Sequence, residues 1–334
     1  MAAEYETPVL EIQNLSLCFK IAGRRAYAIQ NVSLSISRGK TVALVGESGC
    51  GKTMTALTCM GLEPPSSAVA CGTILLNGKN ILSCTEKEWQ EIRGKKISMI
   101  FQEPMSALNP LVKVGQQVME SGIVHGMDKK MAEHRALDLL DKTGLPSPKR
   151  LADCYPHQLS GGQRQRIMIA SALMNSPDVL IADEPTTSLD VTIQTQIIDL
   201  LKDLNRTMHM AVLFITHDLG IVKRICDDIY IMYAGRIVES GDTGLVNSHP
   251  EHLYTRALID SIPAADKRGH PLKAIEGTVP MLGNRADDGC EFYPRCPCRR
   301  DICTLSFPEQ YGFKDHAVWC HLYDDQNRHS GEHD

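Results

Sequence analysis

Residues 46–53 form a glycine-rich turn of the kind that can hold phosphate groups. Glycine lets the backbone turn tightly, so that its N–H groups point inward at phosphate oxygens. Lys52 would reach the β- and γ-phosphates of a nucleotide, and the hydroxyl of Thr53 would bind Mg²⁺. The alternative is an ordinary turn whose lysine faces water. The other residues of the turn, which would form the cradle, are Gly46, Glu47, Ser48, Gly49, Cys50 and Gly51.

Polar side chains follow three further apolar runs, each of which is predicted to be a buried strand. Asp183 would hold Mg²⁺, and Glu184 would act as the general base on the attacking water. Gln102 could hold Mg²⁺ or that water through its amide oxygen, and His217 could contact the γ-phosphate and orient Glu184. Each side chain alone could be an ordinary polar residue at a strand end. Their order and spacing favour phosphate chemistry.

A second anion-binding feature lies more than 100 residues beyond the first. Ser160 stands where a helix N-cap would, and Gly161, Gly162 and Gln163 follow it. Free amide groups at the start of a helix favour anions. Because the two features are so far apart in the chain, they could serve one nucleotide only if two chains share it.

An α/β arrangement is predicted to position these side chains. A strand over 41–45 and a helix over 54–60 flank the phosphate turn, and alternating residues predict antiparallel strands over 9–15 and 28–36. Phe19 could stack on adenine, with Tyr27 as the second choice. Two prolines predict a loop over 102–110. Further strands are predicted over 73–78, 96–101, 179–182 and 211–215, and helices over 114–144, 161–174 and 191–205, with Met131, Leu137, Leu140 and Leu145 on one helical face.

Composition limits the class of protein. The 334 residues carry a formal net charge of −5, which gives no indication of nucleic-acid binding. No apolar run approaches the length needed to span a membrane, and the acidic start over 1–6 does not resemble a signal peptide. We therefore expect a chain in the cytoplasm, where thiols stay reduced.

Six motifs in order resemble the nucleotide-binding subunit of an ABC transporter. They are the turn 46–53, Gln102, the segment 159–163, the run 179–184, the turn Ser188–Leu189–Asp190 and His217. The resemblance implies a P-loop NTPase with a mixed sheet core, and a head-to-tail dimer in which each ATP lies between residues 46–53 of one chain and 159–163 of the other. It implies that Gln102, Glu184 and His217 are catalytic, that Asp190 contributes to the shared site, and that Phe19 is the adenine-stacking aromatic.

Three segments narrow the resemblance to the dipeptide/oligopeptide permease ATPases: 101–110, 155–162 and 182–192. This implies an ATPase that energises peptide import from the cytoplasmic face of the inner membrane. The implied partners are two transmembrane permease subunits, a second homologous ATPase subunit in a heterodimer and an extracytoplasmic solute-binding protein. Residues 103–109 would receive the membrane subunit. The alternatives are an importer of nickel or another non-peptide solute, a soluble ABC ATPase in DNA repair or translation, and an iron–sulfur regulatory module with a vestigial ATPase.

The tail differs in character. We expect an ATP-binding domain over 1–245, with a helical subdomain at about 112–175, and a small cysteine-bearing domain over 246–334. Residues 250–258 resemble the permease family's His-Pro-Tyr-Thr helix start, with Leu253 replacing the proline. Disulfides, a zinc site, buried thiols and a [4Fe–4S] cluster compete as explanations for the cysteines. The permease resemblance implies a cluster on Cys290, Cys296, Cys303 and Cys320, with Cys298 outside the pattern.

Overall fold

The structure is a computed structural model that describes residues 7–21, 23–187, 189–262, 275–286, 288–313 and 315–324. The expectations for the acidic start over 1–6 and for Ser188 lie outside these residues. Within the described ranges, no helix combines the length and the apolar character needed to cross a membrane.

The larger sheet has the strand order β11-β12-β10-β9-β3-β8-β7-β6. Neighbouring strands from β9 to β6 pair in parallel, whereas β10, β11 and β12 join antiparallel, so the mixed sheet predicted from the sequence is confirmed. Every residue of β3, β7 and β8 is buried, which explains why these strands are continuous apolar runs. The strands are β3 (Thr41–Val45), β6 (Ile97–Ile100), β7 (Val179–Asp183), β8 (Ala211–Thr216), β9 (Asp228–Tyr233), β10 (Arg236–Asp242), β11 (Gln310–Phe313) and β12 (His316–Trp319).

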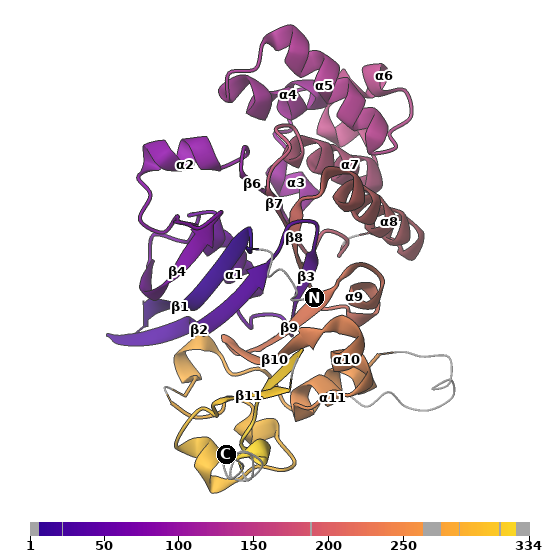
Figure 1. Ribbon diagram of the computed structural model, residues 1–334. Coiled ribbons are helices and arrows are strands. Elements are labelled where there is room, and N and C mark those ends of the chain that lie inside the picture. The colour runs from indigo at the N-terminus through magenta and orange to yellow at the C-terminus, as the bar shows by residue number, and fades with distance from the viewer. Residues whose placement is uncertain are drawn as a thin grey trace, which may run out of the picture.

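A second, antiparallel sheet has the order β2-β1-β4-β5 and packs against the first (Figure 1). Asn77 and Gly78 both have positive φ, 49° and 78°, as a two-residue hairpin turn between β4 and β5 requires. The strands are β1 (Leu10–Ile21), β2 (Arg24–Ile36), β4 (Ser67–Leu76) and β5 (Lys79–Asn80), followed by helix α2 (Glu86–Ile92).

Helices gather at one end of the molecule, above the parallel edge of the larger sheet (Figure 1). Two predictions fail here. Residues 104–107 are helical rather than a loop, because Pro104 occupies the first helical turn, where proline is tolerated. Met131 is 58% exposed, and the buried face of α5 is instead formed by neighbouring residues including Ala132, Ala136 and Leu139. The helices are α3 (Pro104–Ala107), α4 (Val114–Val124), α5 (Lys129–Lys142), α6 (Pro148–Ala152) and α7 (Gly161–Ala172).

The remaining helices accompany the sheet strands. Helix α1 follows the phosphate turn, and α8 and α9 follow β7 and β8. Helices α10 and α11 follow β10, and beyond α11 the helical turns in the described residues are all short 3₁₀ segments. The helices are α1 (Lys52–Cys59), α8 (Val191–Met208), α9 (Leu219–Ile225), α10 (Thr243–Ser248) and α11 (Leu253–Asp260).

The C-terminal region is joined to the main sheet. Strand β12 pairs antiparallel with β10, so the tail extends the sheet. Phe292 packs edge-on against Tyr233 of β9 and also contacts Tyr254 of α11, within one apolar cluster. A separate small cysteine-bearing domain is therefore not confirmed, because strand pairing and shared packing tie the tail to the rest. The boundary at 245 stays a prediction.

Candidate functional site

A cavity of about 560 Å³ opens beside the start of helix α1. The phosphate turn contributes Ser48, Gly49, Gly51, Lys52 and Thr53 to its walls. Gln102 and Glu184, which follow strands β6 and β7, also line it. The size is typical of a cavity that binds a small molecule. Its walls are polar beside the turn and apolar at the other end, where Phe19, Ala28, Val279, Pro280, Met281 and Leu282 lie.

Glycine is required at two positions of the turn. A Cβ on Gly46 would lie 2.1 Å from the carbonyl oxygen of Met232, and one on Gly51, whose φ is +114°, would lie 2.8 Å from that of Ala28. Lys52 is 4% exposed, and its ammonium donates to the carbonyl oxygens of Gly46 at 2.8 Å and Glu47 at 3.0 Å. The lysine thus lies where the turn would surround a phosphate.

Thr53 and Asp183 form an oxygen pair beside the turn. The Thr53 hydroxyl donates to Asp183 Oδ1 at 3.3 Å. Burial raises the pKa of Asp183, and the nearby Glu184 raises it further, whereas the Thr53 hydroxyl lowers it. A buried carboxylate next to a hydroxyl supplies the hard oxygen donors that Mg²⁺ prefers. These two residues, with the amide oxygen of Gln102, could hold the ion.

Glu184 is the centre of a polar cluster. Its φ is +44°, a left-handed conformation uncommon for a residue other than glycine, and its N–H donates to the Ile215 oxygen at 2.9 Å. Gln102 Nε2 donates to Glu184 Oε2 at 3.2 Å, and His217 Nδ1 lies 3.3 Å from Oε1. Thr187 Oγ1 donates to Oε2 at 2.8 Å. The structure therefore brings Gln102, Glu184 and His217 together and adds Thr187, which sequence reasoning passed over although it follows Glu184 by three positions.

Phe19 lines the apolar end of the cavity, and Tyr27 does not. Tyr27 lines a different hollow, formed with residues such as Ile21 and Arg24 of the β1–β2 hairpin. Of the two aromatic residues considered for adenine stacking, only Phe19 lies in the right place.

The second anion-binding feature lies apart from the cavity. Ser160, Gly161, Gly162 and Gln163 open helix α7 and are absent from the cavity walls among the described residues. Ser160 and Gln163 form a reciprocal capping box, with Ser160 N donating to Gln163 Oε1 at 3.0 Å. Asp190 caps helix α8 by accepting from Ile193 N at 3.0 Å. Helices α1 and α7 start in different parts of the molecule (Figure 1), so one chain does not bring both features to one nucleotide.

Residues of the C-terminal region make hydrogen bonds and an ion pair with the phosphate turn. The sequence did not indicate these contacts. Arg295 makes a bidentate ion pair with Glu47, at 2.7 and 3.1 Å, and Glu47 N donates to the hydroxyl of Tyr254 at 2.9 Å. Arg285 Nη2 donates to the Gly49 oxygen at 2.8 Å. Glu47, predicted as a cradle residue, thus turns its side chain and its N–H to the tail. Glu47, Gly46 and Cys50 are not among the cavity-lining residues.

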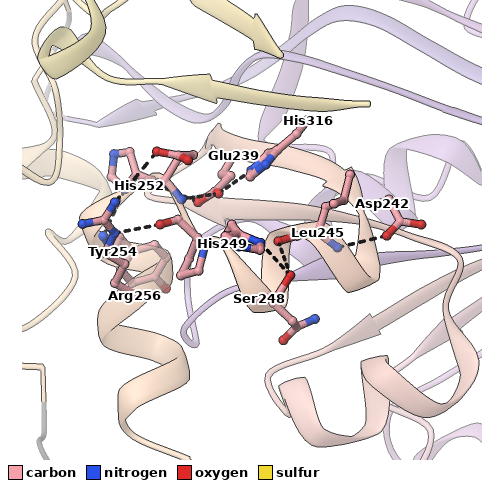
Figure 2. Close-up of polar contacts among 12 residues, drawn as sticks. Glu239, Asp242, Leu245, Ser248, His249, His252, Tyr254, Arg256 and His316 are labelled. Atoms are coloured by element: carbon pink, nitrogen blue, oxygen red, sulfur yellow. Dashed lines mark hydrogen bonds and ion pairs between the residues drawn. The ribbon is translucent and has the colours of Figure 1, made fainter. Parts of the chain in front are cut away.

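A buried carboxylate fixes the helix that carries Tyr254. Glu239 of β10 is fully buried and accepts from the backbone N–H groups of Glu251 at 2.7 Å and His252 at 2.9 Å, while His316 Nε2 lies 2.6 Å from it (Figure 2). His252 Nδ1 accepts from Tyr254 N at 3.1 Å and so caps α11. Burial lowers the pKa of His252 to about 4, although Glu239 opposes this. A helix cap forms here even though Leu253 replaces the expected proline.

All five tail cysteines line one small cavity. Burial raises the pKa of Cys290 to about 12 and of Cys320 to about 11, and it also raises that of Cys296; the neighbouring cysteines raise all three further. Among the described residues, no three His, Cys, Asp or Glu side chains are arranged to hold a metal ion. The arrangement thus gives no support to the predicted iron–sulfur site beyond the shared cavity.

Comparisons with known proteins agree with this geometry. Residues 29–187 match the family described as "ABC transporter", and residues 238–303 match "Oligopeptide/dipeptide transporter, C-terminal region". The Dipeptide transport ATP-binding protein DppD of Bacillus subtilis (strain 168) is 46% identical over 325 residues, covering 96% of this chain and 97% of that protein. The Oligopeptide transport ATP-binding protein OppD of Lactococcus lactis subsp. cremoris (strain SK11) is 44% identical, covering 88% and 87%.

Solved structures show the same fold. The ATP-binding cassette MJ0796, in a dimeric post-hydrolysis state bound to ADP and Pi, has a TM-score of 0.63 and 30% sequence identity. The match covers 70% of this chain and 98% of that one. The protein cbiO1 from Clostridium perfringens, part of the transporter complex cbiONQ, has a TM-score of 0.64 and 27% identity, covering 73% and 92%. The predicted P-loop fold is confirmed.

Proposed function

The chain belongs to the ABC transporter family, and from that premise we propose how it works as the ATP-hydrolysing subunit of a dipeptide or oligopeptide importer. The observation that carries this proposal is that Gln102 and His217 both contact Glu184, and that Gln102 and Glu184 line the cavity beside the phosphate turn. The peptide-transport relatives favour a peptide cargo over nickel or a role on nucleic acid.

The residues of one chain have separate tasks in hydrolysis. Lys52 and the N–H groups of the turn bind the phosphates, and Phe19 stacks on adenine. Thr53, Asp183 and Gln102 would hold Mg²⁺, and the ion would supply positive charge to stabilise the phosphates. Glu184 accepts a proton from the attacking water while the water oxygen bonds to the γ-phosphorus. The bond between the γ-phosphorus and the ADP oxygen breaks in the same step.

Two side chains orient Glu184 for this step. His217 and Gln102 approach its two oxygens from the carboxyl ends of β8 and β6, the strands on either side of β7, which fixes the carboxylate in one direction. His217 also reaches the γ-phosphate. The left-handed backbone of Glu184 places its side chain beside His217 and Gln102. The strained conformation therefore pre-organises the carboxylate for the reaction.

The second half of each site comes from a partner ATPase subunit. Ser160, Gly161, Gly162 and Gln163 of one chain bind the γ-phosphate held by the other, with Asp190 beside them. Their distance from the cavity within one chain supports this sharing. We propose that the partner is a second, homologous ATPase, so that the pair is a heterodimer on two transmembrane permease subunits served by an extracytoplasmic binding protein. Residues 103–109 receive the permease, and the chain is peripheral at the cytoplasmic face of the inner membrane.

We also propose a division of the chain and a role for its cysteines. The ATP-binding domain spans 1–245 with a helical subdomain at about 112–175, and residues 246–334 form the C-terminal unit. Cys290, Cys296, Cys303 and Cys320 hold a [4Fe–4S] cluster. Thiolates are the donors that such a cluster takes, and all four thiols line one cavity.

Substituting Glu184 with glutamine tests the assigned base. Glu184→Gln keeps the shape but cannot accept the proton, so ATP hydrolysis should fall about 10²- to 10⁴-fold. ATP binding should persist and a closed dimer should accumulate, as measured by equilibrium binding and light scattering. Rapid turnover by this variant would refute the assignment.

A pull-down from solubilised membranes tests the transport role. It should recover permease subunits and a peptide-binding protein, whereas recovery only with ribosomes or nucleic acid would overturn that role.

A further inference from the structure

The apolar end of the nucleotide cavity has two walls from opposite ends of the chain. Phe19 of β1 provides one, and a tail segment, residues 279–282, provides the other. Gly283, next along, approaches Ile21, since a Cβ there would lie 3.7 Å from the Ile21 methyl group. The tail therefore runs along the β1–β2 hairpin, beside the place where Phe19 would stack a base.

Arg285 holds this tail segment against the rim. Its Nη1 donates to the carbonyl oxygens of Tyr27 and Ala28, both at 3.1 Å, and its Nη2 donates to Gly49 at 2.8 Å. Its Nε donates to the Pro280 oxygen at 3.5 Å. One guanidinium thus links the segment to the hairpin and to the phosphate turn, which gives the second wall a fixed position.

Met281 is the residue of the segment best placed to meet a ligand. Met281 is 79% exposed although it lines the cavity, whereas Leu282 packs against the apolar core with Phe19. A thioether side chain is flexible and makes favourable contacts with aromatic rings. A base stacked on Phe19 would cover the apolar surface that Met281 now presents to water.

We propose that residues 279–282 form the second face of the nucleotide-base site, with Met281 covering the adenine from the side opposite Phe19. The inference rests on the proposed ATP site and adds a specificity-determining contact from the C-terminal region. The C-terminal region thereby takes part in nucleotide recognition, because Arg285 holds residues 279–282 in place as a wall of the cavity.

Met281→Ala in the full-length chain tests this assignment, with ATP and inorganic tripolyphosphate as the two probes. Tripolyphosphate has no base, so only ATP can use the second wall. We expect the Kd for ATP to rise about 5-fold, from the loss of a few buried methylene contacts, and the Kd for tripolyphosphate to stay unchanged. Leu305→Ala is the matched control, because Leu305 is an exposed tail residue, 74% exposed, that does not line the cavity.

Each outcome separates this inference from the proposed function. If the unaltered chain binds neither probe, the ATP site itself is wrong. If it binds both and Met281→Ala matches Leu305→Ala for ATP, only the second wall is wrong. Equal weakening of both probes would mean a distorted phosphate turn and would also overturn the wall. In a double-mutant cycle, the effects of Phe19→Ala and Met281→Ala on the free energy of ATP binding should be non-additive, because both side chains contact one base. Additive effects would contradict the proposal that the base lies between them.

Discussion

Replacing Arg295 with methionine tests whether the C-terminal region stabilises the phosphate turn. The Arg295 side chain is 4% exposed and that of Glu47 is 30% exposed. The substitution removes two charge-assisted hydrogen bonds to Glu47 and further bonds to the backbone oxygens of Glu276 and Ile275. Removing one partner of a buried ion pair costs about 3 to 5 kcal/mol. Because Glu47 keeps some access to water, we expect the lower end, about 3 kcal/mol.

The pair itself is isolated by a double-mutant cycle with Glu47→Gln. Glutamine keeps one oxygen acceptor but turns an amide N–H₂ toward the guanidinium, so it should cost about 2 kcal/mol alone. The double variant should lose less than the sum of the two, by about 1.5 kcal/mol. Urea unfolding can be followed by the fluorescence of the two tryptophans, Trp89 in α2 and Trp319 in β12.

Arg299→Met is the control, since Arg299 is exposed and lies over the ring of Tyr293, at 5.8 Å, rather than at the turn. It should cost about 0.5 kcal/mol. Equal losses for the two arginine variants, or strict additivity in the cycle, would refute the reasoning that the tail and the turn are energetically coupled.

The other predictions concern the turn, the buried carboxylate and the cysteines. Gly51→Ala should abolish ATP binding, because its Cβ would lie 2.8 Å from the Ala28 oxygen. Gly49→Ala, whose Cβ would have no protein atom within 4 Å, should retain binding and lose only about 1 kcal/mol of stability. Calorimetric titration measures the binding of each variant, and thermal unfolding measures its stability. Glu239→Gln should lower the free energy of unfolding by about 3 kcal/mol, because an amide cannot accept from all three donors, and a loss below about 0.5 kcal/mol in urea titration would contradict this. Anaerobically purified protein should contain iron and acid-labile sulfide, and Cys290→Ser should lose both. Iron-free protein with all five tail thiols titratable would overturn the cluster.

Local signals predicted the centre of the molecule well. The strands β3, β7 and β8 are fully buried on both faces, so their sequences are plain apolar runs, and the polar residues that end them define the site. The turn before α1 needs glycine at Gly46 and Gly51 for steric reasons, so its pattern is specific. In each case the sequence carries the information because the constraint is local.

The errors arose where context overrides a local rule. Two prolines indicated a loop over 102–110, but Pro104 lies in the first turn of a helix. Proline is tolerated there because a backbone N–H at that position would have no acceptor within the helix. A hydrophobic pattern placed Met131 on the buried face of α5, yet the small Ala132 and Ala136 pack there instead. Periodicity alone does not distinguish a large residue at a helix edge from a small one in the packed seam.

Glu47 shows why motif recognition is incomplete as a description of this site. By position it belongs to the phosphate cradle, yet its carboxylate pairs with Arg295, 248 residues away, and its N–H with Tyr254, 207 residues away. No spacing rule relates residues so far apart, because strand pairing between β10 and β12 and the buried Glu239 bring them together. Residues 1–245 contain every nucleotide-binding motif but lack the three tail residues that contact the turn. The motifs therefore determine which reaction occurs, whereas the C-terminal region determines the shape of the turn and the second wall of the cavity in which it occurs.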